Sequence, residues 1–228
     1  MNPLTPIGQL HSPFRDKFGI PRQPGLAPNA EARLELLPPF NHPDCVRGLE
    51  AFSHVWLIFT FHGTQDTTWR PLIRPPRLGG NEKIGVFASR STVRPNPLGL
   101  SVVTLRGIDY SAGVQLLLSG VDLLDGTPIV DIKPYLPYAD AHPEAHSAYA
   151  DPLPRLRVKW TDSARTTVTH WQQHYPQLAA LIEDVLAQDP RPAFHDDPTR
   201  HYGVRLYQLD VRFCVRDKTA TVIELVTT

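Results

Sequence analysis

The sequence predicts a mainly β protein, in which an N-terminal antiparallel β-barrel precedes a small C-terminal α+β domain. The first 135 residues contain many short runs rich in β-branched and aromatic side chains, separated by turn signals without intervening helices. After about residue 140, a polar, proline-containing stretch leads into helical patterns. The predicted division is a barrel over residues 1–140, a linker over 141–153 and a C-terminal domain over 154–228.

Each predicted barrel strand is a short apolar or alternating run that ends at a turn signal. SHVWLIFTFH has the densest β-branched and aromatic content and predicts a buried strand. DYSAG, residues 109–113, predicts a hairpin turn. No G-x-G-x-x-G motif follows a strand, which disfavours a Rossmann-type nucleotide site. In chain order, the predicted strands are residues 7–10, 32–37, 53–62, 84–88, 98–108, 114–121 and 127–132.

The C-terminal part combines strands with two helices. Residues 155–160 predict a strand, and residues 163–174 and 177–187 predict helices interrupted at Tyr175-Pro176. The second helix places apolar residues on one face, which indicates a core-facing helix; they are Leu178, Leu181, Ile182, Val185 and Leu186. Residues 204–215 and 221–226 predict a hairpin around Asp217-Lys218.

Composition excludes several classes of protein. The formal net charge is zero, so overall charge indicates neither a nucleic acid nor a membrane as partner. The N-terminus lacks the pattern of a signal peptide, and no apolar run approaches the roughly 18 residues of a membrane span. We therefore expect a soluble cytoplasmic protein.

The sequence gives no reason to expect a metal site. Cys45 and Cys214 fit no metal-ligand spacing and are expected to be reduced thiols. His142 and His146 are four residues apart, but Pro143 disfavours a helix that would bring them together.

The zero net charge conceals a basic segment between Arg70 and Arg106, which contains seven basic residues and one acidic residue, Glu82. Its arginines alternate with prolines and glycines, as in RPLIRPPRLGGN. This pattern indicates either a solvated basic face or a rigid loop that presents guanidinium groups to phosphates or carboxylates. The segment includes GVFASRSTVRPNPLGLS, residues 85–101, in which Arg90 and Arg94 interrupt an apolar sequence.

Two further stretches combine rigid backbone with polar side chains. In DLLDGTPIVDIKPYLPYAD, residues 122–140, Asp125-Gly126 is a turn signal and Asp131 lies within an apolar strand. These residues indicate either a solvent-facing turn or a carboxylate that lines a pocket. KFGIPRQPGL, residues 17–26, is either an ordinary Ω loop or a third loop that, together with the two stretches above, lines the opening of one pocket in the barrel. Residue chemistry thus predicts a barrel with a rigid, arginine-bearing rim and leaves the reaction open.

Six motifs together resemble the tRNA-methyltransferase O (TrmO) family, whose members are also known as YaeB- or TsaA-like proteins. The motifs are GVFASRSTVRPNPLGLS, DGTPIVDIKPYLPYAD, EAFSHVWLIFTFH, RPPRLGGN, PRQPGL and LAQDPRPAF. The resemblance implies S-adenosylmethionine-dependent methylation of N6 of threonylcarbamoyladenosine at position 37 of tRNA, beside the anticodon. It also implies a barrel with a small C-terminal domain, working as a homodimer with the cofactor near the subunit interface. The alternatives are a methyltransferase of the same barrel type with another acceptor, and a non-catalytic RNA-binding barrel.

The resemblance also assigns cofactor contacts. Arg90 is expected to pair with the cofactor carboxylate or to close the site over the substrate. Leu100 offers its backbone and an apolar surface. His62 ends an apolar strand, where a histidine more often packs or makes a backbone contact than acts as a base. The full predicted set is Gln23, Pro24, Gly25, His62, Gly63, Arg90, Leu100, Ile129, Val130, Asp131 and Ile132.

On this interpretation the opening of GVFASRSTVRPNPLGLS, residues 85–88, is a barrel strand that ends at the cofactor pocket. Pro95 and Pro97 restrict the backbone after it, and Gly99 lets two chain segments approach closely.

The implied reaction is a single in-line displacement that needs no metal. The acceptor nitrogen is conjugated to the purine and to a carbonyl, so it is a poor nucleophile until it loses a proton, and a general base would help. Asp125 and Asp131 are both candidates for this base. The tRNA phosphates are expected to meet the barrel at Arg74, Arg77 and Arg94. Residues 183–197 hold five acidic residues against one basic residue and are expected to face away.

Overall fold

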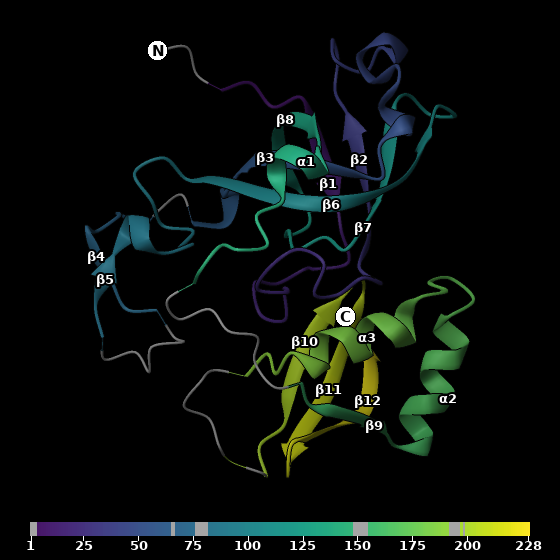
Figure 1. Cartoon of the computed structure of the whole chain (residues 1–228). Coiled ribbons are helices and arrows are strands. Elements are labelled where there is room, and N and C mark those ends of the chain that lie inside the picture. The colour runs from purple at the N-terminus through teal and green to yellow at the C-terminus, as the bar shows by residue number, and fades with distance from the viewer. Residues whose placement is uncertain (1–3, 65–66, 76–81, 148–154, 192–196, 198) are drawn as a thin grey trace.

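The computed structural model describes residues 4–64, 67–75, 82–147, 155–191, 197 and 199–228. Figure 1 shows a β-barrel formed by the N-terminal part of the chain and, beside it, a four-stranded sheet with two helices formed by the C-terminal part. The predicted fold class, a barrel followed by a small α+β domain, is confirmed.

Six antiparallel strands close the barrel. Their order around it is β1-β2-β7-β6-β3-β8, and β8 pairs back with β1. Alternate residues along β3 are buried, so one set of side chains fills the barrel and the other faces outward. The strands are β1 (Gly8–His11), β2 (Glu31–Leu36), β3 (His54–Thr60), β6 (Leu98–Asp109), β7 (Gln115–Ser119) and β8 (Thr127–Pro134). The turn predicted at residues 109–113 joins β6 and β7.

The predicted barrel strand at residues 84–88 is wrong. Only β5 (Ile84–Gly85) is a strand, and it pairs with β4 (Leu72–Ile73) outside the barrel. Val86–Ala88 forms a 3-10 turn in which Val86 is buried while Phe87 is 78% exposed. A short apolar run does not reveal its partner strand, which explains the error. We call described residues 67–75 and 82–89 the β4–β5 arm; Figure 1 shows its two strands beyond the end of β6.

The C-terminal sheet has the order β10-β11-β12-β9, in which β9 runs parallel to β12. Its strands are β9 (Arg157–Trp160), β10 (Tyr202–Leu206), β11 (Leu209–Arg216) and β12 (Thr219–Thr227), and its helices are α2 (Asp162–Trp171) and α3 (Leu178–Ala187). A further short helix, α1 (Pro137–Asp140), follows the barrel. The apolar face predicted for α3 is buried as expected.

One predicted C-terminal strand divides in two. The chain reverses at Tyr207, whose φ of 55° is uncommon for a residue other than glycine, so residues 204–215 form parts of β10 and β11. The hairpin predicted around Asp217-Lys218 is confirmed, because these two residues have φ of 48° and 56° in the turn between β11 and β12.

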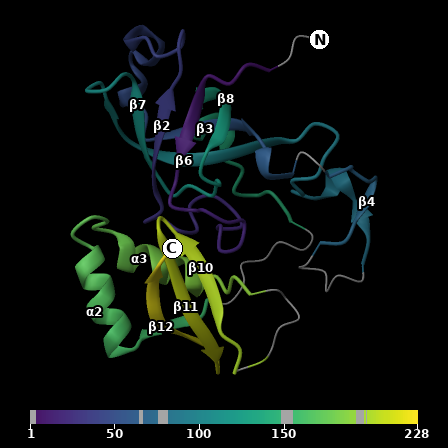
Figure 2. The same ribbon diagram turned by 180° about the vertical axis from the view of Figure 1, so that it is seen from behind.

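The two parts of the molecule are joined through the loop after β1. The Tyr207 amide donates to the Pro13 carbonyl at 2.7 Å, and Phe14 forms a bridge with Leu206. Asn29 donates to the Asp184 carboxylate through its side chain at 2.9 Å. Figure 2 shows from behind that β10 lies next to the barrel end. The predicted linker boundaries stay predictions, because residues 148–154 lie outside the described residues.

Candidate active site

A cavity of about 730 Å³ lies beside the barrel, and we call it the first cavity. Five chain segments meet there: the loop after β1, the ends of β3 and β6, the loop after the β4–β5 arm and the loop after β7. Sites for small molecules are typically concave, apolar over much of their surface and equipped with a few polar groups. The first cavity has this composition.

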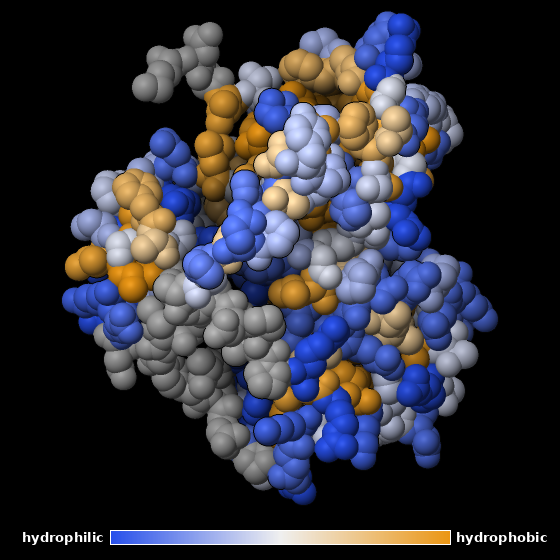
Figure 3. Space-filling model, viewed as in Figure 1, coloured by the Kyte–Doolittle hydropathy of each residue, from blue (hydrophilic) through white to orange (hydrophobic). Residues whose placement is uncertain are grey.

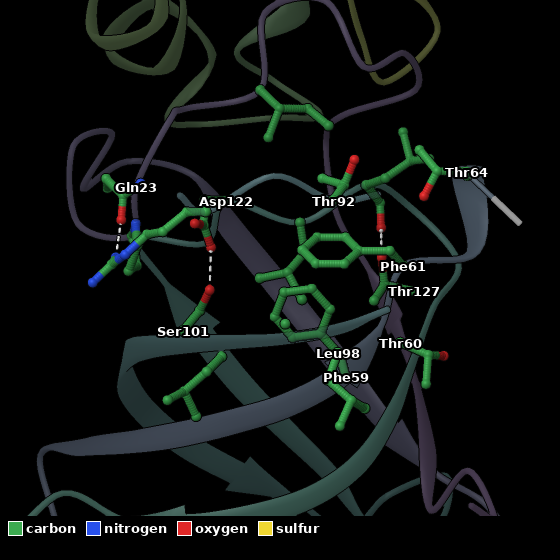
Figure 4. A pocket seen from close by; sticks show the side chains of 18 of the residues that line it. Gln23, Phe59, Thr60, Phe61, Thr64, Thr92, Leu98, Ser101, Asp122 and Thr127 are labelled. Carbon is green, nitrogen blue, oxygen red and sulfur yellow. Dashed lines mark hydrogen bonds between the residues drawn. The ribbon is translucent and has the colours of Figure 1, made fainter. Parts of the chain in front are cut away.

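Aromatic and aliphatic side chains form its apolar wall. The rings of Phe59 and Phe61 are 5.2 Å apart at 80°, an edge-to-face contact. A Cβ at Gly99 would overlap the Phe59 ring, so the glycine leaves room for this side chain, whereas the sequence had predicted a close approach of backbone. Leu98 and Leu100 are 40% and 55% exposed, so the apolar wall continues onto the outer face of β6. Figure 4 shows both phenylalanine rings at the centre of the cavity.

Cationic groups stand at the mouth of the cavity. The Arg90 guanidinium donates to the Gln23 side-chain oxygen, and the Lys17 ammonium donates to the Gly63 carbonyl. Arg90 is exposed and Gln23 is half-buried, so the pair remains accessible to a ligand. Because guanidinium and ammonium groups bind carboxylates, this edge can hold an anionic group.

Asp122 supplies a carboxylate to the same cavity. The Ser101 hydroxyl donates to its Oδ1 at 2.7 Å. Burial raises the pKa of Asp122 from 3.8 to about 6, against the opposing effects of the Ser101 hydrogen bond and the Arg90 charge. Figure 4 shows Asp122 and Ser101 facing one another on the side of the cavity nearest Gln23.

The structure brings together part of the predicted cofactor set. The residues of this set that line the first cavity are Gln23, Pro24, His62, Gly63, Arg90 and Leu100. His62 lies in the 3-10 turn His62–Thr64 directly after β3. The cofactor roles of these residues stay predictions, now with a shared location.

The rest of the set lies elsewhere in this single chain. Gly25 is next to the cavity and its amide donates to the Gly120 carbonyl at 2.8 Å. Ile129 is fully buried in the barrel, and Val130 and Ile132 are outside the lining of the first cavity. Asp131 pairs with the Lys133 ammonium at 3.2 Å on β8, and both side chains are about half exposed.

Asp125, the other predicted base, lines a different cavity. This second cavity, of about 570 Å³, lies between the barrel and the C-terminal part and is also lined by Tyr175 and Tyr207. Asp125 accepts the Ser12 amide at 2.9 Å and forms an ion pair with Arg15. Neither predicted base therefore lies in the first cavity.

Asp122 was not among the residues predicted from the sequence, because no local pattern marks it as buried. Asp122 lies in the loop after β7, three residues beyond Ser119, and its neighbours Val121 and Leu123 are both buried. In an extended segment, successive side chains point to opposite faces, so buried neighbours do not predict burial of the residue between them. The sequence instead makes Asp125, three residues later, a candidate for the general base, because its Asp-Gly pair is a recognisable turn signal.

The predicted RNA contacts are dispersed. Arg74 is exposed on the β4–β5 arm, and Arg77 lies outside the described residues. Arg94 is half-buried and donates to the Ser89 carbonyl at 2.7 Å and to the Val86 carbonyl at 3.3 Å. Its guanidinium thus stabilises the loop that carries Arg90, a role that the sequence did not indicate.

Two family domains match consecutive parts of this chain. The tRNA-methyltransferase O N-terminal domain matches residues 9–141, and the TrmO C-terminal domain matches residues 153–228. The chain belongs to the tRNA-methyltransferase O family. The resemblance inferred from the six motifs is thereby confirmed.

Relatives in the TrmO family are similar over most of their length. The tRNA (adenine(37)-N6)-methyltransferase of Escherichia coli (strain K12) is 48% identical over 216 residues, which cover 92% of each chain. A putative S-adenosylmethionine-dependent methyltransferase RcsF of Pseudomonas aeruginosa is 54% identical over 213 residues, covering 92% of this chain and 91% of the relative. The crystal structure of TrmO from Pseudomonas aeruginosa aligns with a TM-score of 0.84 at 46% identity and covers 99% of both chains.

No helix in the described part of the chain has the length and apolar character needed to cross a membrane. The same residues contain no cluster of three or more histidine, cysteine or acidic side chains that would hold a metal ion. Cys45 and Cys214 are both free thiols.

Proposed function

We propose that this chain transfers a methyl group from S-adenosylmethionine to N6 of threonylcarbamoyladenosine at position 37 of tRNA. As a TrmO-family member, it is an S-adenosylmethionine-dependent tRNA (adenine37-N6)-methyltransferase. The observation that best supports the proposal is the first cavity, which combines the Phe59–Phe61 wall, the Arg90–Gln23 pair and the Asp122 carboxylate.

The cavity residues fit the chemical groups of the cofactor. Leu100 and the phenylalanine rings offer apolar surface to an adenine, and Arg90 offers a guanidinium to a carboxylate. S-adenosylmethionine supplies the methyl group, while the protein aligns donor and acceptor and excludes water. Holding two reactants in line lowers the barrier by removing translational and rotational freedom.

A transfer assay with labelled S-adenosylmethionine tests the proposal. Purified protein should methylate tRNA that bears threonylcarbamoyladenosine and leave the matched unmodified tRNA unlabelled. Labelling of the unmodified tRNA would favour another acceptor. Failure to bind S-adenosylmethionine in calorimetry would favour a non-catalytic RNA-binding barrel.

We also propose that the chain works as a homodimer with the first cavity near the subunit interface. Leu98 and Leu100 expose apolar surface on the outer face of β6, and Trp69, Leu72 and Phe87 are 45%, 54% and 78% exposed on the β4–β5 arm. Figure 3 shows apolar surface over the arm. Exposed apolar side chains of this kind are found at interaction sites, and a two-fold pair would contain two equivalent cavities.

Light scattering and dilution test the dimer. The protein should have twice the monomer mass at micromolar concentration, and its activity should fall on dilution into the range in which it dissociates. A monomer that is fully active at nanomolar concentration would refute the homodimer.

The substrate contact that we propose is the anticodon loop of tRNA. N6 lies on the Watson–Crick edge of adenine, and a single-stranded loop allows the base to be splayed into a pocket without opening a duplex. Exposed Arg74 on the β4–β5 arm supports an approach of the phosphate backbone from the barrel side. A tRNA substrate is consistent with a cytoplasmic location, which fractionation of cells expressing the tagged protein would test.

A further inference from the structure

Asp122 is the only carboxylate among the described residues that line the first cavity. The charged side chains around it are cationic: Lys17, Arg22, Arg90 and Arg94, with His62 as a further titratable group. Asp122 is therefore the single acidic group among the described charged side chains of this cavity, and its presence there needs a reason. The second cavity has no such imbalance, since its Asp125 forms an ion pair with Arg15.

The position of Asp122 is set by elements on both sides. Val121 and Leu123 are buried, so the backbone that carries the carboxylate is held in the core. Ser101, on β6, is also buried and donates its hydroxyl hydrogen to Oδ1. No other side chain in the described part of the chain is within hydrogen-bonding distance of the Asp122 carboxylate. A backbone hydrogen bond within Asp122 also favours its ionised form, and the two oxygens together retain lone pairs for a ligand.

The proposed reaction needs a proton acceptor at this place. Methylation of a nitrogen that keeps its hydrogen would leave a cation on a nitrogen already conjugated to a purine and a carbonyl. A carboxylate within hydrogen-bonding reach removes that proton as the new bond forms. Asp125 and Asp131 are both outside the cavity, and Asp122 is the carboxylate that this chain places in its lining.

We propose that Asp122 is the general base of the methyl transfer and that Ser101 is its positioning residue. The inference rests on the proposed function. The N6–H bond breaks and its proton passes to the Asp122 carboxylate, while the N6–CH₃ bond forms. The bond between methyl and sulfur breaks, and its electron pair stays on the sulfur, which loses its positive charge. Charge and atoms balance without a further reactant.

A rival role for Asp122 is to bind the ammonium group of the cofactor. A carboxylate with that role works best when it stays ionised across the physiological range. With a pKa of about 6, the Asp122 carboxyl is mostly ionised near neutral pH, which suits either role, so the two roles are separated by the effects of substitution on cofactor affinity and on rate. The influences that oppose burial are the Ser101 hydroxyl, a backbone hydrogen bond within Asp122 and the Arg90 charge, all of which favour the ionised form.

The first test compares methyl transfer and cofactor binding in Asp122→Asn. Positioned bases contribute about 10²–10⁴-fold to rate, so single-turnover methylation should fall by at least about 100-fold. Calorimetric affinity for S-adenosylmethionine should stay within about 3-fold of wild type. Asp109→Asn is the matched control, because Asp109 accepts the Ser111 amide in the β6–β7 turn, outside the first cavity, and should leave both quantities unchanged.

The second test uses the pH profile and Ser101→Ala. The wild-type rate should fall below a pH of about 6 as Asp122 becomes protonated. Loss of the Ser101 donor disfavours the ionised carboxylate, so the acidic limb of Ser101→Ala should move to higher pH, and Ser101→Thr should restore it. A purely structural role for Ser101 would lower the rate without moving the limb.

The outcomes separate the two proposals. If the wild type transfers no methyl group to tRNA, both are overturned. If the wild type is active and folded Asp122→Asn is equally active, only the assignment of the base is wrong. If Asp122→Asn loses cofactor affinity in proportion to rate, the carboxylate binds the cofactor instead.

Discussion

Asp122 and Asp125 are three residues apart, yet the fold places them in different cavities with different electrostatics. Asp122 lines the first cavity, where its side-chain partner is a neutral hydroxyl and burial raises its pKa. Asp125 lines the second cavity, where the Ser12 amide and the Arg15 guanidinium satisfy it. A carboxylate with satisfied partners stabilises the fold, whereas one that is buried with few partners is available for chemistry. The following experiments test this contrast.

The largest difference in cofactor affinity or rate should appear between substitutions of Arg90, at the first cavity, and Arg15, at the second cavity. Arg90→Ala removes a charge-assisted contact and should weaken S-adenosylmethionine binding or lower the rate by about 10–150-fold, equivalent to about 1.5–3 kcal/mol. Arg90→Lys should restore only part of the lost affinity or rate, because an ammonium group lacks the planar, paired N–H donors of the guanidinium. Arg15→Ala, at the second cavity, should leave cofactor affinity unchanged in calorimetry. Equal effects at both arginines would contradict the assignment of the first cavity.

The two glycines of β6 provide a steric comparison. A Cβ at Gly99 would overlap the Phe59 ring, whereas one at Gly107 would meet nothing within 4 Å. Gly99→Ala should therefore lower the free energy of unfolding by about 1–3 kcal/mol, because the ring must shift. Gly107→Ala should change it by about 0.5 kcal/mol or less. Urea denaturation measures both, and a neutral Gly99→Ala would show that the cavity wall is not tightly packed.

Stability against pH should distinguish the two aspartates. The unfolded chain releases the Asp122 proton near pH 3.8 and the native state near 6, so the native state binds more protons between these values. The free energy of unfolding therefore falls as pH rises through this window and stays lowered above it. Asp122→Asn should remove the penalty and be more stable than wild type by about 1–3 kcal/mol near pH 8, with the difference vanishing below about pH 4.

Asp125→Asn should instead be destabilised, because it removes a partly exposed ion pair, and it should cost about 1 kcal/mol or less near pH 8. Thermal melts of both variants across this pH range would measure the contrast. If Asp122→Asn were less stable than wild type near pH 8, the ionised Asp122 carboxylate would stabilise the fold, which would contradict the penalty expected from its burial.

The smallest effect should arise at the RNA surface. Replacing Arg74 and Arg77 together by alanine should weaken tRNA binding several-fold. The slope of the logarithm of the binding constant against the logarithm of the salt concentration should become shallower by about 0.7–0.9 per lost phosphate contact. Cofactor affinity should stay near normal. Arg216→Ala, an exposed arginine at the end of β11, is the matched control and should change neither quantity. Wild-type tRNA binding by the double variant at every salt concentration would point to an approach through the C-terminal domain.

Local patterns predicted much of the fold because they depend on neighbours along the chain. The alternation in β3 and the one-sided apolar pattern of α3 both follow from the period of a single element. The error at β5 and the undivided strand across Tyr207 arose where the pairing partner, or an unusual φ, lies beyond what such a pattern contains.

The sequence by itself determined the family, the fold class and half of the candidate site. Long motifs identify the TrmO family, and they include Gln23, His62 and Arg90, which meet at the first cavity. Only the tertiary structure decided that Asp122, rather than Asp125 or Asp131, lies within that cavity. The physical reason is that the pKa of a carboxyl depends on burial and on groups brought from distant strands and loops, here Ser101 and Arg90, and linear spacing along the chain does not encode their proximity.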